Sequence, residues 1–179
     1  YTSVAGLGRT PEEVSFTGGH GVRVRNCGPE PPGPPLEQYP YADVGALDNF
    51  WRSAENLRVT GGSLMWATSQ AAPLRSVVAD SVAFHDGAGW GSGGYAANLR
   101  VAGGLDFGTQ QQSFVRHSSL GGGVASYPSF SSVFVGCSPP SPRERCGGGG
   151  GAVASIDGAP VAEKPFLFAE GRRLWLGVP

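Results

Sequence analysis

The heptapeptide NLRVTGG at Asn56–Gly62 recurs almost unchanged as NLRVAGG at Asn98–Gly104, 42 residues later. Its pair of an apolar residue and an arginine returns at Leu74-Arg75 and at Val115-Arg116, so that the successive spacings are 17, 25 and 16 residues. Strand-like runs that return about every 20 to 25 residues between glycine turns are typical of a solenoid. The repeat predicts an all-β fold, a right-handed parallel β-helix. A chance repeat caused by biased composition is the alternative.

Stacking explains how such short strands are stable. One strand cannot bury its apolar face alone, but coils about 4.8 Å apart allow aliphatic side chains to form an inward row. The neighbouring arginines should point outward, because side chains alternate along a strand. Since stacked like charges repel, we expect these arginines to alternate with acidic residues or to spread into solvent. We expect the inward row to contain Leu57, Leu74, Leu99 and Val115, and the outward arginines to be Arg58, Arg75, Arg100 and Arg116.

Composition and charge restrict the fold and the partners. Thirty glycines and fifteen prolines in 179 residues, of which 15% are charged, indicate one turn-dense β domain and argue against a helical bundle. A net charge of −1 with scattered basic residues argues against a nucleic-acid partner. The apolar runs are far shorter than the roughly 20 residues of a membrane-spanning helix, so we expect no membrane partner. We also expect no cofactor.

The three cysteines lack the spacing of a zinc site, so we expect no metal ion. Cys137 and Cys146 bracket the segment SPPSPRER, and Cys27 is left over. A disulfide between Cys137 and Cys146 would suit a secreted protein, whereas two free thiols would suit a cytosolic one. The sequence leaves both possibilities open.

Composition divides the chain into three parts. Residues 1–146 form a partial β-helix, and the proline-rich segment 27–41 loops out of it because proline cannot donate to a strand ladder. Residues 147–151 are five consecutive glycines, which act as a linker or a loop. Residues 152–179 return to strand-like runs.

Aromatic and amide side chains are candidate binding groups. Phe50 and Trp51 either fill the interior of the coil or stack on a sugar, and we expect one in the core and the other at the surface. Trp66 leaves the same two possibilities open, and Trp90 is the large anchor of a glycine-rich bend. In Gln110–Gln112, a strand would place the first and third side chains on one face and Gln111 on the other, in an amide ladder or a binding site.

Four ordered blocks between Asn49 and Leu120 resemble the first β-helix of glycoside hydrolase family 55, a family of exo- and endo-β-1,3-glucanases. They read NFWRSAENLRV, MWATSQAAPLRSV, HDGAGWGSGGYAANLRVAGG and GTQQQSFVRHSSL. The later block AEKPFLF looks like the connection toward a second β-helix. The resemblance implies two pectate-lyase-like β-helices side by side in one secreted parent chain. A cleft between them would bind β-glucan and hydrolyse it with inversion.

The same resemblance implies roles for individual residues. Gln70 and Ser92 match family positions that hold the attacking water, so we expect them in one cleft on adjacent coils. Gln111 would line the cleft or form a ladder. Asp86, in the bend that contains Trp90, would bind sugar hydroxyls or form a turn with the glycine that follows it. Trp66 and Trp90 are the candidate sugar-binding aromatics.

The general acid of the family has no counterpart in this chain. Inversion requires a carboxylic acid and a base, or a polar group that orients water, with the two carboxyl groups about 6.5–9.5 Å apart. Gln70 and Ser92 can orient water but cannot donate a proton. Asp86 and Glu163 are acidic residues that lie in matching blocks. We expect Asp86 to form a turn with the glycine that follows it, and Glu163 to lie in an exposed junction, so neither is expected to act as the general acid. We therefore expect negligible laminarin hydrolysis by this chain alone.

Two other functions are compatible with a β-helix. A non-catalytic solenoid that binds carbohydrate or mediates attachment would need no general acid, and no second β-helix with a glutamate facing a cleft. A pectate lyase would need clustered aspartates for calcium and a basic residue for proton abstraction. The sequence has no such cluster of aspartates.

Overall fold

The computed structural model describes residues 2–18, 21–24, 46, 49–85, 90–108, 110–126, 128, 130–138, 152–157 and 160–179. The proline-rich segment 27–41 and the glycines 147–151 lie outside the described residues, so the proposed division of the chain stays a prediction. Within the described residues, no helix is long and apolar enough to cross a membrane.

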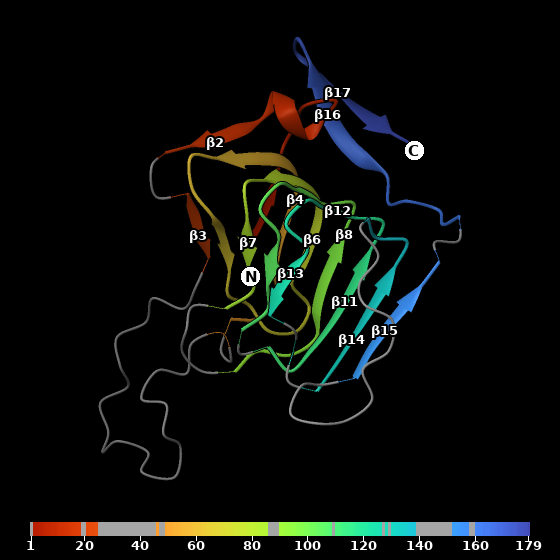
Figure 1. Ribbon diagram of the computed structural model, residues 1–179. Coiled ribbons are helices and arrows are strands. Elements are labelled where there is room, and N and C mark those ends of the chain that lie inside the picture. The colour runs from red at the N-terminus through yellow and green to blue at the C-terminus, as the bar shows by residue number, and fades with distance from the viewer. Residues whose placement is uncertain are drawn as a thin grey trace.

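Two parallel sheets wind around a common core (Figure 1). The main ladder follows the order β1 (Thr2–Ala5), β4 (Arg52–Thr60), β6 (Pro73–Ala79), β8 (Gly94–Ala97), β11 (Gln112–Arg116), β14 (Ser131–Val135) and β15 (Ala152–Ile156). Beside it, β2 (Ser15–Thr17) pairs with β4, and β9 (Arg100–Val101) pairs with β6 and with β12 (Ser119–Leu120). The second sheet has the order β13 (Val124–Ser126), β10 (Leu105–Asp106), β7 (Val82–Ala83), β5 (Leu64–Trp66) and β3 (Val22–Val24).

Every pair in the two sheets is parallel, which confirms the predicted all-β parallel β-helix. Two further elements stand outside this pattern. A 3₁₀ turn, η1 (Pro11–Glu13), precedes β2, and an antiparallel hairpin of β16 (Phe166–Glu170) and β17 (Arg173–Gly177) follows the solenoid.

The inward rows differ from the predicted one. All four predicted aliphatic residues are buried, with at most 4% of their surface exposed. However, Leu74 and Val115 lie in register with each other through Ala96, whereas Leu57 pairs with Val77. The row that contains Leu74 is Ala54, Leu74, Ala96, Val115 and Phe134, and its steps are 20, 22, 19 and 19 residues. The predicted single row was therefore wrong, because it mixed members of two rows.

A left-handed bend separates the two rows. Asn56, Ser76, Asn98 and His117 lie at equivalent positions of successive coils, and their φ angles are 55°, 48°, 56° and 46°. Asparagine tolerates this conformation better than most residues, and Asn56 also donates from Nδ2 to the carbonyl oxygens of Gly6 and Gly8, at 3.0 and 2.7 Å. The asparagine of the NLRV repeat thus lies at the bend. Two other coils have serine or histidine at the same position, so the repeat cannot be recognised there from the sequence.

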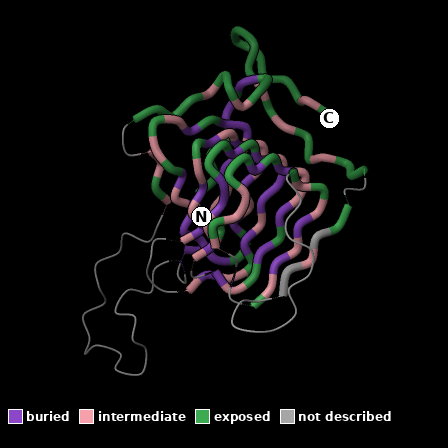
Figure 2. Tube along the Cα trace, in the orientation of Figure 1, coloured by how far each residue is buried: buried purple, intermediate pink, exposed green. Residues whose placement is uncertain are grey.

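The core continues on the far side of the bend. Val59, Ala79, Val101 and Leu120 form another inward row, in register from β4 to β12. Near the second sheet, the ring of Phe107 stacks on Phe84 at 4.9 Å between centroids and meets Phe134 edge-on at 6.2 Å. Figure 2 shows buried residues alternating with less buried ones along the strands of the solenoid, whereas the C-terminal hairpin is largely exposed.

The predicted outward arginines occupy two columns. Arg58 and Arg100 are separated by Val78, and Arg75 and Arg116 by Ala97, so no two of these arginines stack on adjacent coils. Two of them have acidic partners, as predicted: Arg100 pairs with Glu12, and Arg116 with Glu163. Arg75 instead lies over the Tyr95 ring, at 4.5 Å from its centroid.

Cys137 carries a free thiol. Its side chain packs against the core, and this burial raises the pKa of the thiol. The predicted partner, Cys146, lies outside the described residues. The Cys137–Cys146 disulfide therefore stays a prediction.

Candidate functional site

One position of the coil, one to three residues before the strands of the main ladder, carries the candidate site. Register places Gln70, Ser92 and Gln111 at this position on three successive coils. We call these three residues the polar row. Phe50 occupies the same position on the coil before the row, and Phe130 on the coil after it. Backbone bonds tie the coils together here, from Gln111 N to Gly91 O at 2.7 Å and from Phe130 N to Gln111 O at 2.9 Å.

Gln70 and Ser92 are in direct contact. The Gln70 Nε2 donates to Ser92 Oγ at 2.5 Å, and the Ser92 backbone N–H donates to Ser69 Oγ at 3.4 Å. Gln70 is exposed and Ser92 is partly exposed, so both are accessible from solvent. The predicted placement on adjacent coils is confirmed. Since an amide oxygen accepts and a hydroxyl can both accept and donate, the pair is able to orient a water molecule, and this role stays a prediction.

Gln110 supports the row from inside. It is 1% exposed, and its Nε2 donates to Thr68 O at 2.7 Å and to Phe84 O at 2.8 Å. A Cβ on Gly91 would lie 2.3 Å from this Nε2, so only glycine fits beside the amide. The strand begins at Gln112, which is exposed, and the predicted shared face of Gln110 and Gln112 is therefore wrong. Sequence reasoning missed the structural role of Gln110.

The predicted aromatic and acidic groups have different outcomes. Trp66 is 3% exposed and its indole donates to Ala72 O at 3.0 Å, so it is a core residue with no free ring face for a sugar. This corrects the prediction for Trp66. Trp90 is partly exposed and lies two residues before Ser92, and its sugar-binding role stays a prediction. Asp86 lies outside the described residues. Trp51 lies at the surface, with 59% of its surface exposed, whereas Phe50 is partly buried and is not a member of the core cluster, so only the surface half of the prediction for this pair is confirmed.

Carboxylates with described contacts lie away from the polar row. Glu55 binds Lys164 at 2.5 Å, and Asp106 lies 3.3 Å from His85 Nε2. Glu163 makes a bidentate pair with Arg116, in which Nη2 and Oε2 are 2.8 Å apart. None of these groups is placed to donate a proton beside Gln70. Among the described residues, no group of three or more histidine, cysteine or acidic side chains could hold a metal ion.

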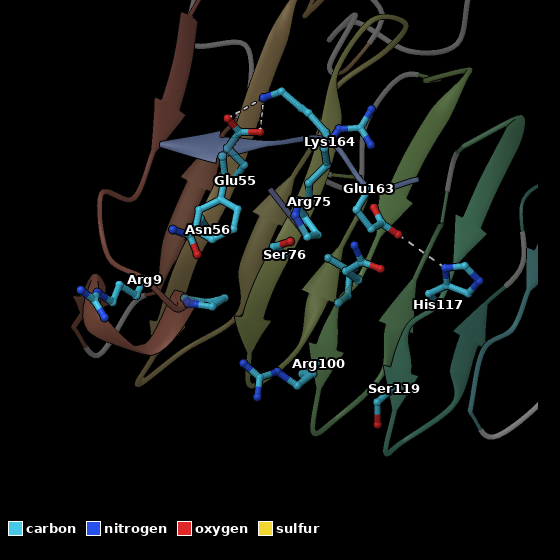
Figure 3. Close-up of a pocket in the computed structure, with 15 residues that line it drawn as sticks. Arg9, Glu55, Asn56, Arg75, Ser76, Arg100, His117, Ser119, Glu163 and Lys164 are labelled. Atoms are coloured by element: carbon cyan, nitrogen blue, oxygen red, sulfur yellow. Dashed lines mark hydrogen bonds and ion pairs between the residues drawn. The ribbon is translucent and has the colours of Figure 1, made fainter. Parts of the chain in front are cut away.

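A separate hollow of about 430 Å³ lies over the left-handed bends, where residues 163–166 cross the coils (Figure 3). Its charged groups largely pair with one another across the junction, as in Lys164 with Glu55 and Glu163 with Arg116 and His117. The Glu163 side chain is 22% exposed, so the predicted exposed junction is in fact partly buried. We assign this hollow to the attachment of the C-terminal segment, because the paired charges leave no acid for catalysis.

Glu163 is fixed as a carboxylate. Its hydrogen bonds with Arg116 lower the pKa of the carboxyl to about 2. Since a general acid must be protonated near the working pH, Glu163 cannot serve as one.

This pair predicts a pH dependence. Because the pKa of Glu163 is lowered on folding, its contribution to stability is present above about pH 4.5 and is lost as the pH falls toward about 2, by an amount on the order of 2 kcal/mol. Urea unfolding at several pH values should show this loss in the native chain and a smaller one in Glu163→Gln. An equal loss in both would contradict the assignment.

Comparison with known proteins gives the chain a relative. It is 36% identical over 187 residues to an exo-beta-1,3-glucanase from Streptomyces sp. (strain SirexAA-E / ActE), and the match covers 100% of this chain. A variant of sacteLam55A from the same strain, solved in complex with glucose, superposes with a TM-score of 0.76 and 31% identity over 99% of this chain. The structure of sacteLam55A itself superposes with a TM-score of 0.71 and a sequence identity of 28%, again over 99% of this chain. No protein-family model matches the chain.

The match covers only part of these relatives. The chain spans 27% of the length of the glucanase and 29% and 30% of the two solved chains. The chain is thus a homologue of a segment of an exo-β-1,3-glucanase, and the resemblance to glycoside hydrolase family 55 that its sequence predicts is confirmed.

Proposed function

We propose that the protein hydrolyses β-1,3-glucan with inversion and that this chain forms one wall of the cleft. The observation that carries the proposal is the contact between Gln70 Nε2 and Ser92 Oγ, which places two uncharged polar groups on adjacent coils of an exposed surface. The homology to an exo-β-1,3-glucanase over the whole chain supports the choice of substrate.

In the proposed reaction, Gln70 and Ser92 hold the water that attacks the anomeric carbon. A carboxylic acid on the opposite face of the sugar protonates the oxygen of the leaving group. As the new C–O bond forms and the bond to the leaving oxygen breaks, the attacking water passes its proton to solvent water, because neither Gln70 nor Ser92 is a base, and the configuration at the anomeric carbon inverts. The positioning of the water by two neutral dipoles contributes through orientation, because the water is held before the bond forms.

The general acid comes from outside the described residues in this proposal. The relative is several times longer than this chain, which leaves room for a second β-helix that carries the acid and the other wall of the cleft. Extracellular β-glucan as the substrate makes secretion the expected location.

The test is hydrolysis of laminarin by the full-length protein, followed by ¹H NMR. Inversion predicts that the first product carries the α configuration and that the β form appears only by mutarotation. A first product with the β configuration would contradict inversion. Binding of laminarin without any hydrolysis would instead favour a non-catalytic carbohydrate-binding β-helix.

A further inference from the structure

A second hollow lies beside the polar row, on the first coils of the solenoid. It has a volume of about 360 Å³, within the range of about 300–1,000 Å³ that is usual for ligand sites. Three chain segments build it: β1, the start of β4, and the bend before β6. The lining residues are Thr2, Ser3, Trp51, Arg52, Ser53, Ala71 and Pro73.

Trp51 is the unusual residue of this hollow. Its φ angle is 57°, in the left-handed region, and 59% of its surface is exposed. The equivalent positions on the next two coils are Ala71, with φ 56°, and Gly93, with φ 71°, so the bend itself is compatible with small residues. A bulky side chain in this conformation is strained, and an exposed indole gains little from burial. The bend itself therefore does not require a tryptophan at this position.

Polar residues line the hollow together with Trp51. Arg52 Nη1 donates to Phe50 O at 2.7 Å, which holds the guanidinium at the edge of the hollow. Thr2 and Ser3 on β1 pair in register with Arg52 and Ser53 on β4, and hydroxyl-bearing residues from both strands line the same hollow as Trp51. The backbone N–H of Trp51 donates to Gln70 O at 3.4 Å, which connects the hollow directly to the polar row.

This combination fits a pyranose. A sugar ring offers an apolar face of C–H groups and an edge of hydroxyl groups, and the hollow offers an aromatic face with hydroxyl and guanidinium groups beside it. We propose that the hollow is a glucan subsite in which Trp51 stacks on a glucose unit adjacent to the one at Gln70 and Ser92. The identity of the sugar rests on the proposed function, whereas the hollow itself does not.

The experiment compares Trp51→Ala and Trp51→Phe with the native full-length protein. Trp175, an exposed tryptophan of the C-terminal hairpin, gives the matched control Trp175→Ala. We expect Trp51→Ala to raise the KM for laminarin about tenfold with kcat nearly unchanged, since a lost stacking contact removes binding that substrate and transition state share. Trp51→Phe should retain most of the affinity for laminarin, and Trp175→Ala should have the KM and kcat of the native protein.

Binding of laminarihexaose, measured by calorimetry, separates this inference from the proposed function. Weaker binding by Trp51→Ala than by Trp175→Ala supports the subsite even if the native protein hydrolyses no glucan. Unchanged binding and KM in Trp51→Ala would overturn the subsite, even with full hydrolysis by the native protein. A lower melting temperature of Trp51→Ala with unchanged KM would also overturn it, because Trp51 would then serve the fold.

Discussion

Replacement of Gln70 by alanine is expected to lower the kcat of laminarin hydrolysis by the full-length protein about 10²-fold, which is the usual cost of misplacing a reacting group, here the attacking water. Ser92→Ala should also lower the kcat of laminarin hydrolysis. Because Gln70 Nε2 donates to Ser92 Oγ, the two residues act as one unit, and the double variant should be little worse than the worse single one.

The control for this experiment is Ser63→Ala, an exposed serine between β4 and β5 and away from the polar row. It should keep native kcat and KM. Urea unfolding should show that Gln70→Ala is as stable as the native protein, since the Gln70 side chain is exposed. Native activity in both Gln70→Ala and Ser92→Ala would show that the contact between them has no part in the reaction.

Phe107→Ala is expected to destabilise the chain by about 3–5 kcal/mol. Phe107 is fully buried, and its ring contacts both Phe84 and Phe134, so alanine leaves a cavity at the meeting point of the inward rows. Equilibrium unfolding in urea measures the change, with Phe16→Ala as the control. Phe16 is 42% exposed on β2, and its removal should change stability by about 0.5 kcal/mol or less.

An equal effect of the two substitutions would contradict the burial of Phe107 inside the coils. The aromatic cluster that Phe107 forms would then not be part of the core.

The fold was predictable because its repeat is visible in sequence. A β-helix places one strand per coil in register, so similar apolar-arginine pairs return along the chain. The exact rows were not predictable, because they depend on backbone bends. The left-handed bend at Asn56 and Asn98 is marked by asparagine, but Ser76 and His117 adopt the same conformation with no such signal. A prediction based on leucine-arginine pairs alone therefore joined Leu57 to Leu74 across the bend.

The candidate site shows the same limit. The placement of Gln70 beside Ser92 followed from a resemblance in blocks that keep their order, and the structure confirms it. Trp66 and Gln110 are buried because of where the neighbouring strands begin and end, and the local sequence does not predict these boundaries. The hollow at Trp51 needs Thr2 and Ser3, about 50 residues earlier in the chain, and only the register of β1 with β4 brings them together.

The most direct test of the central claim is a crystal structure of the full-length protein with a bound laminari-oligosaccharide. The account predicts that a glucose unit lies against the polar row, with a water molecule held by Gln70 and Ser92 on the face of the sugar opposite the leaving oxygen. An oligosaccharide bound instead in the hollow beside His117 and Glu163, with Gln70 and Ser92 away from any sugar, would contradict it.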